Sequence, residues 1–248
     1  MIQLALFLSL TVSISLVSFA GIALIPGAQM PESARGLPVW LLAAWGPSLA
    51  AILLAARSGE LSDLVYRAIQ FSGVPLAVWF IALSPLMVLA FAVLRNGGLP
   101  DVHLLTVGMI AKVILLNLIL GPTGEELGWR GVMQPLLSGH MGWFAASLVV
   151  GAVWFAWHLP LWLVNSPQAE IPVPLFGAHV MAYALILGAM AHLSPSIAPA
   201  ILFHLAVNVM AGVALVGGLG DSAAYFRVTL LPYWAIALAV TGWLALRS

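Results

Sequence analysis

The chain has 248 residues, and its 8 Lys and Arg residues balance its 8 Asp and Glu residues, so the formal net charge is zero. Charged residues make up 6% of the chain, against roughly 25% in a soluble domain, and hydrophobic residues make up 63%. So few charged side chains cannot cover a surface in water, which excludes a soluble globular protein. The sequence has no basic tract to support nucleic-acid binding, and no cysteine for a disulfide or a thiol nucleophile.

The apolar residues form blocks of about 20, the length that a helix needs to cross roughly 30 Å of hydrocarbon. Continuous runs of this length indicate helices, because the strands of membrane barrels alternate over about 10 residues. We therefore predict an all-α fold, a polytopic integral membrane bundle, with residues 1–248 as one membrane-embedded domain. About eight spans are expected, near residues 2–24, 37–56, 74–94, 103–121, 142–164, 176–193, 197–217 and 228–246.

The most informative segment, residues 121–137, reads GPTGEELGWRGVMQPLL. Pro122 predicts the start of a new or kinked helix, which carries Glu125, Glu126 and Arg130. Glu126 and Arg130 share a helix face and can pair, whereas Glu125 is rotated by about 100° and can point elsewhere. Two adjacent carboxylates in different environments suit general acid/base chemistry. The alternative is a solvated loop with an ordinary ion pair.

Two later spans carry polar side chains at membrane depth. His158 lies in an apolar aromatic run, and Pro160 cannot donate to the carbonyl of Ala156, so the helix should loosen beside this histidine. His204 and Asn208 lie four residues apart and can hold an oxyanion from one helical stripe. Taken singly, each of these polar residues could instead be a packing residue or hydrogen-bond neighbouring helices.

The other histidines and one lysine carry less information. His103 and His140 fall near span ends, where they are expected to reach interfacial water. His179 and His192 are expected to hydrogen-bond between helices. Lys112 lies within a span without a nearby acidic residue, and could snorkel or face a polar cavity.

Three polar sites on three helices of a chain so poor in polar residues are expected to be related. In their order they resemble the CPBP family of intramembrane proteases, which comprises the CAAX prenyl-protein endopeptidases of the Ras-converting type and bacterial bacteriocin-processing and immunity proteins. The strings GEELGWRG and WHLPLW look like the prokaryotic branch of this family. The resemblance covers a motif-bearing core of residues 121–208, with motif positions Glu125, Glu126, Arg130, His158, His204 and Asn208.

The second motif departs from the family pattern at one position. It is usually Phe-x-x-x-His, whereas Trp154 stands four residues before His158 and the phenylalanine is Phe155. The ring is still aromatic, so the departure concerns packing more than the role of the histidine.

The resemblance implies three roles within the site. They are activation of a water molecule for attack on a peptide carbonyl, stabilisation of the oxyanion, and orientation of the site. By the resemblance these roles fall to Glu125 and His158, to His204 and Asn208, and to Glu126 and Arg130, respectively.

The leading hypothesis is an intramembrane glutamate-type endopeptidase of a prokaryotic cell membrane, with no obligatory metal or cofactor. Its partners would be membrane lipid and a peptide or protein substrate, prenylated or leader-bearing. One alternative is a zinc protease with Glu125 or Glu126, His158 and His204 as ligands, although no His-Glu-x-x-His motif supports it. Another is a transporter or binding protein with a buried polar site, although no inverted repeat is visible.

Overall fold

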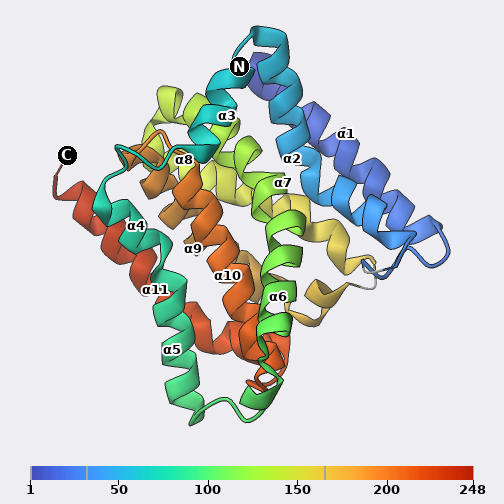
Figure 1. Cartoon of the computed structure of the whole chain (residues 1–248). Coiled ribbons are helices and arrows are strands. Elements are labelled where there is room, and N and C mark those ends of the chain that lie inside the picture. Colours follow the sequence, from blue (N-terminus) through green and yellow to red (C-terminus); the bar gives the residue numbers. More distant parts are fainter. Residues whose placement is uncertain (1, 32, 165, 248) are drawn as a thin grey trace.

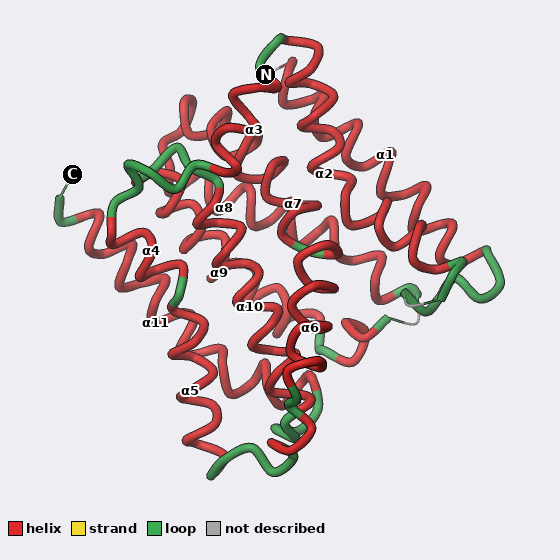
Figure 2. The backbone as a smooth tube through the Cα atoms, in the orientation of Figure 1, coloured by secondary structure: helices red, strands yellow, loops and turns green. Residues whose placement is uncertain are grey.

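The structure is a computed structural model that describes residues 2–31, 33–164 and 166–247. Within these ranges every regular element is a helix (Figures 1 and 2), which confirms the predicted all-α class. Short 3₁₀ or π turns are labelled η. The bounds are α1 (Ile2–Leu24), α2 (Gly36–Ser58), α3 (Leu61–Ile69), α4 (Leu76–Ala82), α5 (Ser84–Asn96), η1 (Val102–Leu104), α6 (Val107–Leu120), α7 (Pro122–Gly128), η2 (Trp129–Met133), α8 (Gln134–His158), η3 (Leu159–Trp162), η4 (Pro167–Glu170), α9 (Val173–Leu193), α10 (Ala198–Val216) and α11 (Ser222–Ala245).

Seven helical stretches in the described part of the chain are long and apolar enough to cross a membrane. Six of them match single predicted spans, whereas the stretch Val107–Trp162 has 56 residues and contains the two spans predicted at 103–121 and 142–164. The expected number of about eight spans therefore agrees with the structure once this long stretch is divided. The chain is a multi-pass integral membrane protein.

Proline and glycine divide the long apolar stretches. Around Pro85 the span predicted at 74–94 breaks into α4 and α5, as expected for a proline inside an apolar run. Pro47 stays within α2, which continues to Ser58. Gly142 has φ 77° and ψ 160°, so α8 consists of two helical segments, 134–141 and 143–158.

The bend at Gly142 changes how the motif-bearing segment is organised. Residues 122–141 form a helical run of their own through α7, η2 and the first part of α8, and this run begins at Pro122, as predicted. The first motif therefore lies in a helix that packs within the bundle. Figure 1 shows α7 between α2 and α6, with α10 beside them.

Two glycines set how closely α7 approaches α2. A Cβ atom on Gly128 would lie 2.6 Å from the carbonyl oxygen of Pro47, and one on Gly124 would lie 2.7 Å from the carbonyl oxygen of Ala44. Small residues four apart let two helix backbones come this close in a membrane protein. The acidic pair of the first motif lies between these glycines, so their packing positions the pair against α2.

The helix then widens into a π turn at Trp129–Met133, where the backbone N–H of Gln134 donates to the carbonyl of Trp129. Such turns occur within α-helices, frequently at functional sites. The Trp129 side chain is fully buried, and its ring meets Phe7 and Trp157 edge-on at centroid distances of 5.8 and 5.9 Å. The turn is thereby held between α1 and the second part of α8.

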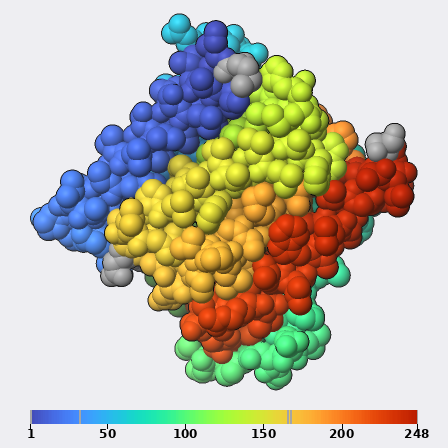
Figure 3. All heavy atoms as spheres, turned by 180° about the vertical axis from the view of Figure 1, so that it is seen from behind, coloured from blue at the N-terminus to red at the C-terminus, as the bar shows by residue number. Residues whose placement is uncertain are grey.

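Helix α9 is the most enclosed of the long helices, with most of its side chains buried. Seen from behind, the second part of α8 lies between α1 with α2 and α9 with α11 (Figure 3). The His179 Nε2 atom of α9 lies 3.3 Å from Thr229 Oγ1 of α11, which confirms the interhelical hydrogen bond predicted for this histidine.

The close approach of α7 to α2 predicts a large difference between two glycine substitutions. Gly128→Ala should destabilise the protein by about 1 to 3 kcal/mol, because the new methyl group overlaps the Pro47 backbone. Gly139→Ala is the control, because a Cβ atom there meets nothing within 4 Å, and it should be neutral or stabilising by up to about 1 kcal/mol. Thermal unfolding in detergent measures both. Equal melting temperatures for the two variants would contradict this account of the helix contact.

Candidate active site

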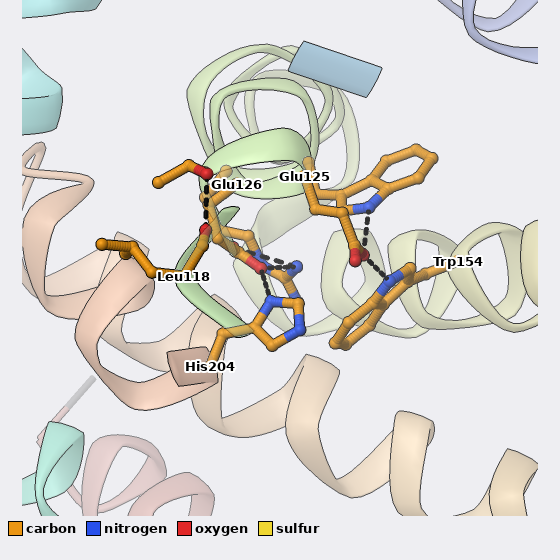
Figure 4. Close-up of polar contacts among 8 residues, drawn as sticks. Leu118, Glu125, Glu126, Trp154 and His204 are labelled. Atoms are coloured by element: carbon orange, nitrogen blue, oxygen red, sulfur yellow. Dashed lines mark hydrogen bonds and ion pairs between the residues drawn. The ribbon is translucent and has the colours of Figure 1, made fainter. Parts of the chain in front are cut away.

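Glu126 lies at the centre of a buried ionic cluster. Its Oε1 atom is 2.7 Å from His204 Nδ1 and 3.2 Å from an Arg130 guanidinium nitrogen (Figure 4). Glu126 is fully buried and Arg130 is 3% exposed. The pair predicted from their spacing is confirmed, and the alternative of a solvated ion pair is wrong, because the helix that carries both residues packs inside the bundle.

The contact with Glu126 determines that Nδ1 of the His204 ring carries a hydrogen. An ionised carboxylate only accepts hydrogen bonds, so Nδ1 of His204 donates to Glu126 and Nε2 faces the other way. A Cβ atom on Gly121 would lie 3.9 Å from His204 Nε2 and 2.8 Å from Asn208 Nδ2. His204 and Asn208 therefore present their side-chain nitrogens to the same place, the chain reversal that precedes α7, as their spacing predicts.

Glu125 points away from this cluster, as the rotation between adjacent helix positions predicts. Its Oε2 atom accepts hydrogen bonds from the indole N–H groups of Trp154, at 2.6 Å, and Trp129, at 3.4 Å (Figure 4). Its Oε1 atom makes no hydrogen bond among the described residues. The two neighbouring carboxylates thus have different partners.

Neither tryptophan is among the site residues predicted from the sequence. Trp129 stands four residues after Glu125, on the same helix face, and this spacing was a usable signal. Trp154 was noted only as an aromatic substitute in the second motif. Its hydrogen bond to Glu125 joins residues 29 positions apart, so only the tertiary structure shows it.

His158 closes α8. Its Nδ1 atom is 2.8 Å from the carbonyl oxygen of Trp154, which can only accept, so Nδ1 carries the hydrogen and Nε2 is left as an acceptor. The 3₁₀ turn Leu159–Trp162 follows directly, which confirms that the helix loosens beside Pro160. The ring packs edge-on against Trp157 and Phe176, at centroid distances of 4.7 and 5.1 Å.

Four of the six predicted site residues line one cavity of about 460 Å³: Glu125, His158, His204 and Asn208. Glu126 and Arg130 do not line it and lie behind its wall. Most of the remaining lining is apolar or aromatic, contributed by α2, α6, α9, α10 and α11. Among the described residues, the acidic and basic side chains that line the cavity are those of Glu125, His158 and His204 alone.

The donor set does not fit a metal ion. In the described part of the chain, no three His, Asp or Glu side chains come together as a metal site requires. Glu126 is held by Arg130 and His204, while Glu125 is held by indole N–H groups. The zinc alternative therefore gains no support, and no step of the chemistry is derived through a metal.

Three further histidines and Lys112 do not line the cavity. His103, His140 and His192 are exposed, and the His192 ring stacks on Trp143 at a centroid distance of 5.5 Å. Lys112 is exposed on α6 and does not line the cavity. Among the histidines, His179 and His204 are buried and His158 is partly buried, in contrast to these three exposed ones.

Two comparisons with known proteins found similarity to one family of proteases. Residues 107–210 match the family model described as Rce1-like, type II CAAX prenyl endopeptidase Rce1-like. A segment of 59 residues is 46% identical to "CAAX prenyl protease 2" of the archaeon Methanococcus maripaludis, and it covers 23% of this chain and 22% of that relative. The match thus spans about a fifth of the curated relative's length. Over the segment that carries its motifs, this chain is similar to the Rce1-like CAAX prenyl endopeptidases, which confirms the resemblance predicted from those motifs.

Proposed function

We propose that this chain is an intramembrane glutamate-type endopeptidase that hydrolyses a peptide bond with a water molecule activated by Glu125 and His158. The observation that carries the proposal is the shared cavity, in which these two groups lie together with His204 and Asn208. The similarity of residues 107–210 to the CAAX prenyl endopeptidases supports the same reaction.

Water activation needs a proton acceptor held in a fixed position. Indole N–H groups tether Glu125 Oε2, so Oε1 is free to take a proton from water as the water oxygen attacks the peptide carbonyl carbon. His158 Nε2 is a second acceptor that can hold the same water. The proton then passes to the leaving amine nitrogen when the carbon–nitrogen bond breaks, which balances the hydrolysis.

The negative charge that develops on the carbonyl oxygen needs hydrogen-bond donors. The Asn208 amide supplies one, and His204 Nε2 supplies another when the ring carries both hydrogens. The Glu126 carboxylate on the far side of the ring compensates that positive charge, and Arg130 in turn holds Glu126. In a cavity of low dielectric, each such donor is worth about 3 kcal/mol.

The substrate is inferred from the cavity lining. An apolar, aromatic wall suits an uncharged apolar segment of a membrane-associated peptide or protein, with or without a prenyl group. The whole chain would act as one protease domain among membrane lipids. The prokaryotic character of the motif strings and the archaeal relative support a prokaryotic cell membrane as its place.

Replacing the proposed base is the first test. Glu125→Gln should abolish turnover and leave the melting temperature nearly unchanged, because the amide keeps the side-chain shape but cannot take the proton. The assay is cleavage of an internally quenched apolar peptide, made with and without a farnesyl thioether, by purified protein in liposomes. Glu60→Gln, on the exposed turn before α3, is the matched control and should retain full activity. Equal product formation by wild type and Glu125→Gln, at any level, would contradict the proposal.

Removal of metal is the second test. Because Glu125 and His158 activate water without a metal in this proposal, exhaustive chelation should leave the rate of peptide cleavage unchanged. Metal content measured by mass spectrometry should stay below one ion per protein molecule. Stoichiometric zinc, together with chelator-sensitive activity that added zinc restores, would replace this mechanism by the zinc alternative.

A further inference from the structure

The Trp154 side chain hydrogen-bonds to the site in addition to packing against aromatic rings. Its side chain is 3% exposed, and its indole N–H donates to Glu125 Oε2 at 2.6 Å. A carboxylate that is removed from water loses the hydrogen bonds of its hydration shell. A hydrogen bond from an N–H group to a carboxylate oxygen is a strong one and can replace one of those lost bonds. The indole therefore holds the carboxylate in one orientation.

The ring of Trp154 is itself held in place by the ionic cluster. The Arg130 guanidinium carbon lies 4.8 Å from the ring centroid, over the ring. The His204 ring meets it edge-on at a centroid distance of 5.3 Å. A cation over an aromatic face and an edge-on ring pair both fix the plane of the indole. The direction of the N–H bond is set by the cluster around the other carboxylate.

The same residue also reaches His158, through its backbone. The carbonyl oxygen of Trp154 accepts from His158 Nδ1 at 2.8 Å, which leaves Nε2 as the acceptor of a ring that lines the cavity. This bond depends on the helix and would survive a change of side chain at position 154. The indole bond to Glu125 depends on the tryptophan alone, because phenylalanine fills the ring position but has no N–H group.

Resting on the proposed function, we propose that Trp154 is a positioning residue that orients the proton-accepting carboxylate of Glu125. Its indole links the two carboxylates of the first motif, since it is clamped by the partners of Glu126 and donates to Glu125. Glu125 Oε1 is thereby left as the oxygen that meets water. Trp129, at 3.4 Å, is the weaker of the two donors.

The kinetic test compares two tryptophan substitutions. Trp154→Phe should lower kcat for the quenched peptide about tenfold to a hundredfold and leave KM within about twofold, because the bond acts on the base. Trp162→Phe is the control, because the Trp162 side chain does not line the cavity and its indole donates to the backbone carbonyl of Ile171 at 2.9 Å rather than to a carboxylate. Its kcat should stay within about twofold of wild type. Loss of kcat in Trp154→Phe with retained KM supports the positioning role. A kcat near the wild-type value in Trp154→Phe overturns it and leaves the proposed function standing.

A spectroscopic readout keeps the test decisive if Trp154→Phe does not fold. With ¹⁵N-labelled tryptophan, the indole proton signal of Trp154 should move upfield in Glu125→Gln, because an amide oxygen accepts more weakly than a carboxylate. The Trp162 signal should stay in place. An unmoved Trp154 signal overturns the inference. Full turnover by Glu125→Gln overturns the proposed function and the positioning role together, whatever the indole signal does.

Discussion

The site depends on the hydrogen bonds and charge pairing of one buried carboxylate, that of Glu126. A lone charge in this position would cost several kcal/mol, so it must have partners, and it has two: Arg130 one helical turn away and His204 from α10. The first bond is local and the second joins residues 78 apart in sequence, so the pair of bonds fastens α7 to α10. The same carboxylate keeps a hydrogen on Nδ1 of His204 and can compensate the positive charge of the ring when Nε2 carries one too.

The positions of the other site residues depend on how the short helix α7 packs into the bundle. Gly124 and Gly128 let α7 lie against α2, and Arg130, in the π turn after them, pairs with Glu126 one helical turn before it. The adjacent carboxylate then points to the opposite side, where indole N–H groups hold it. Two identical side chains, next to each other in sequence, thus receive different partners and can do different chemistry.

The sequence predicts some parts of this structure well and others not at all. Composition and run length give the helical membrane fold, and the four-residue spacing gives the Glu126–Arg130 pair, because both depend on local repeats. The contact of His204 with Glu126 and the bond from Trp154 to Glu125 depend on how helices cross, which no local pattern encodes. The bend at Gly142 is not predicted either, because the apolar pattern continues through it. Only the positive φ angle in the structure reveals it.

The most direct measurement of this account is the stability of Arg130→Ala beside that of Asp63→Ala. The first removes a partner from the fully buried Glu126, and the second breaks the Asp63–Arg67 pair, in which the Asp63 side chain is 64% exposed. The account predicts a loss of about 3 to 5 kcal/mol and of peptide cleavage for Arg130→Ala, against at most about 1 kcal/mol and full activity for Asp63→Ala. Similar small losses in both variants, with activity retained, would contradict the central place of the Glu126 cluster.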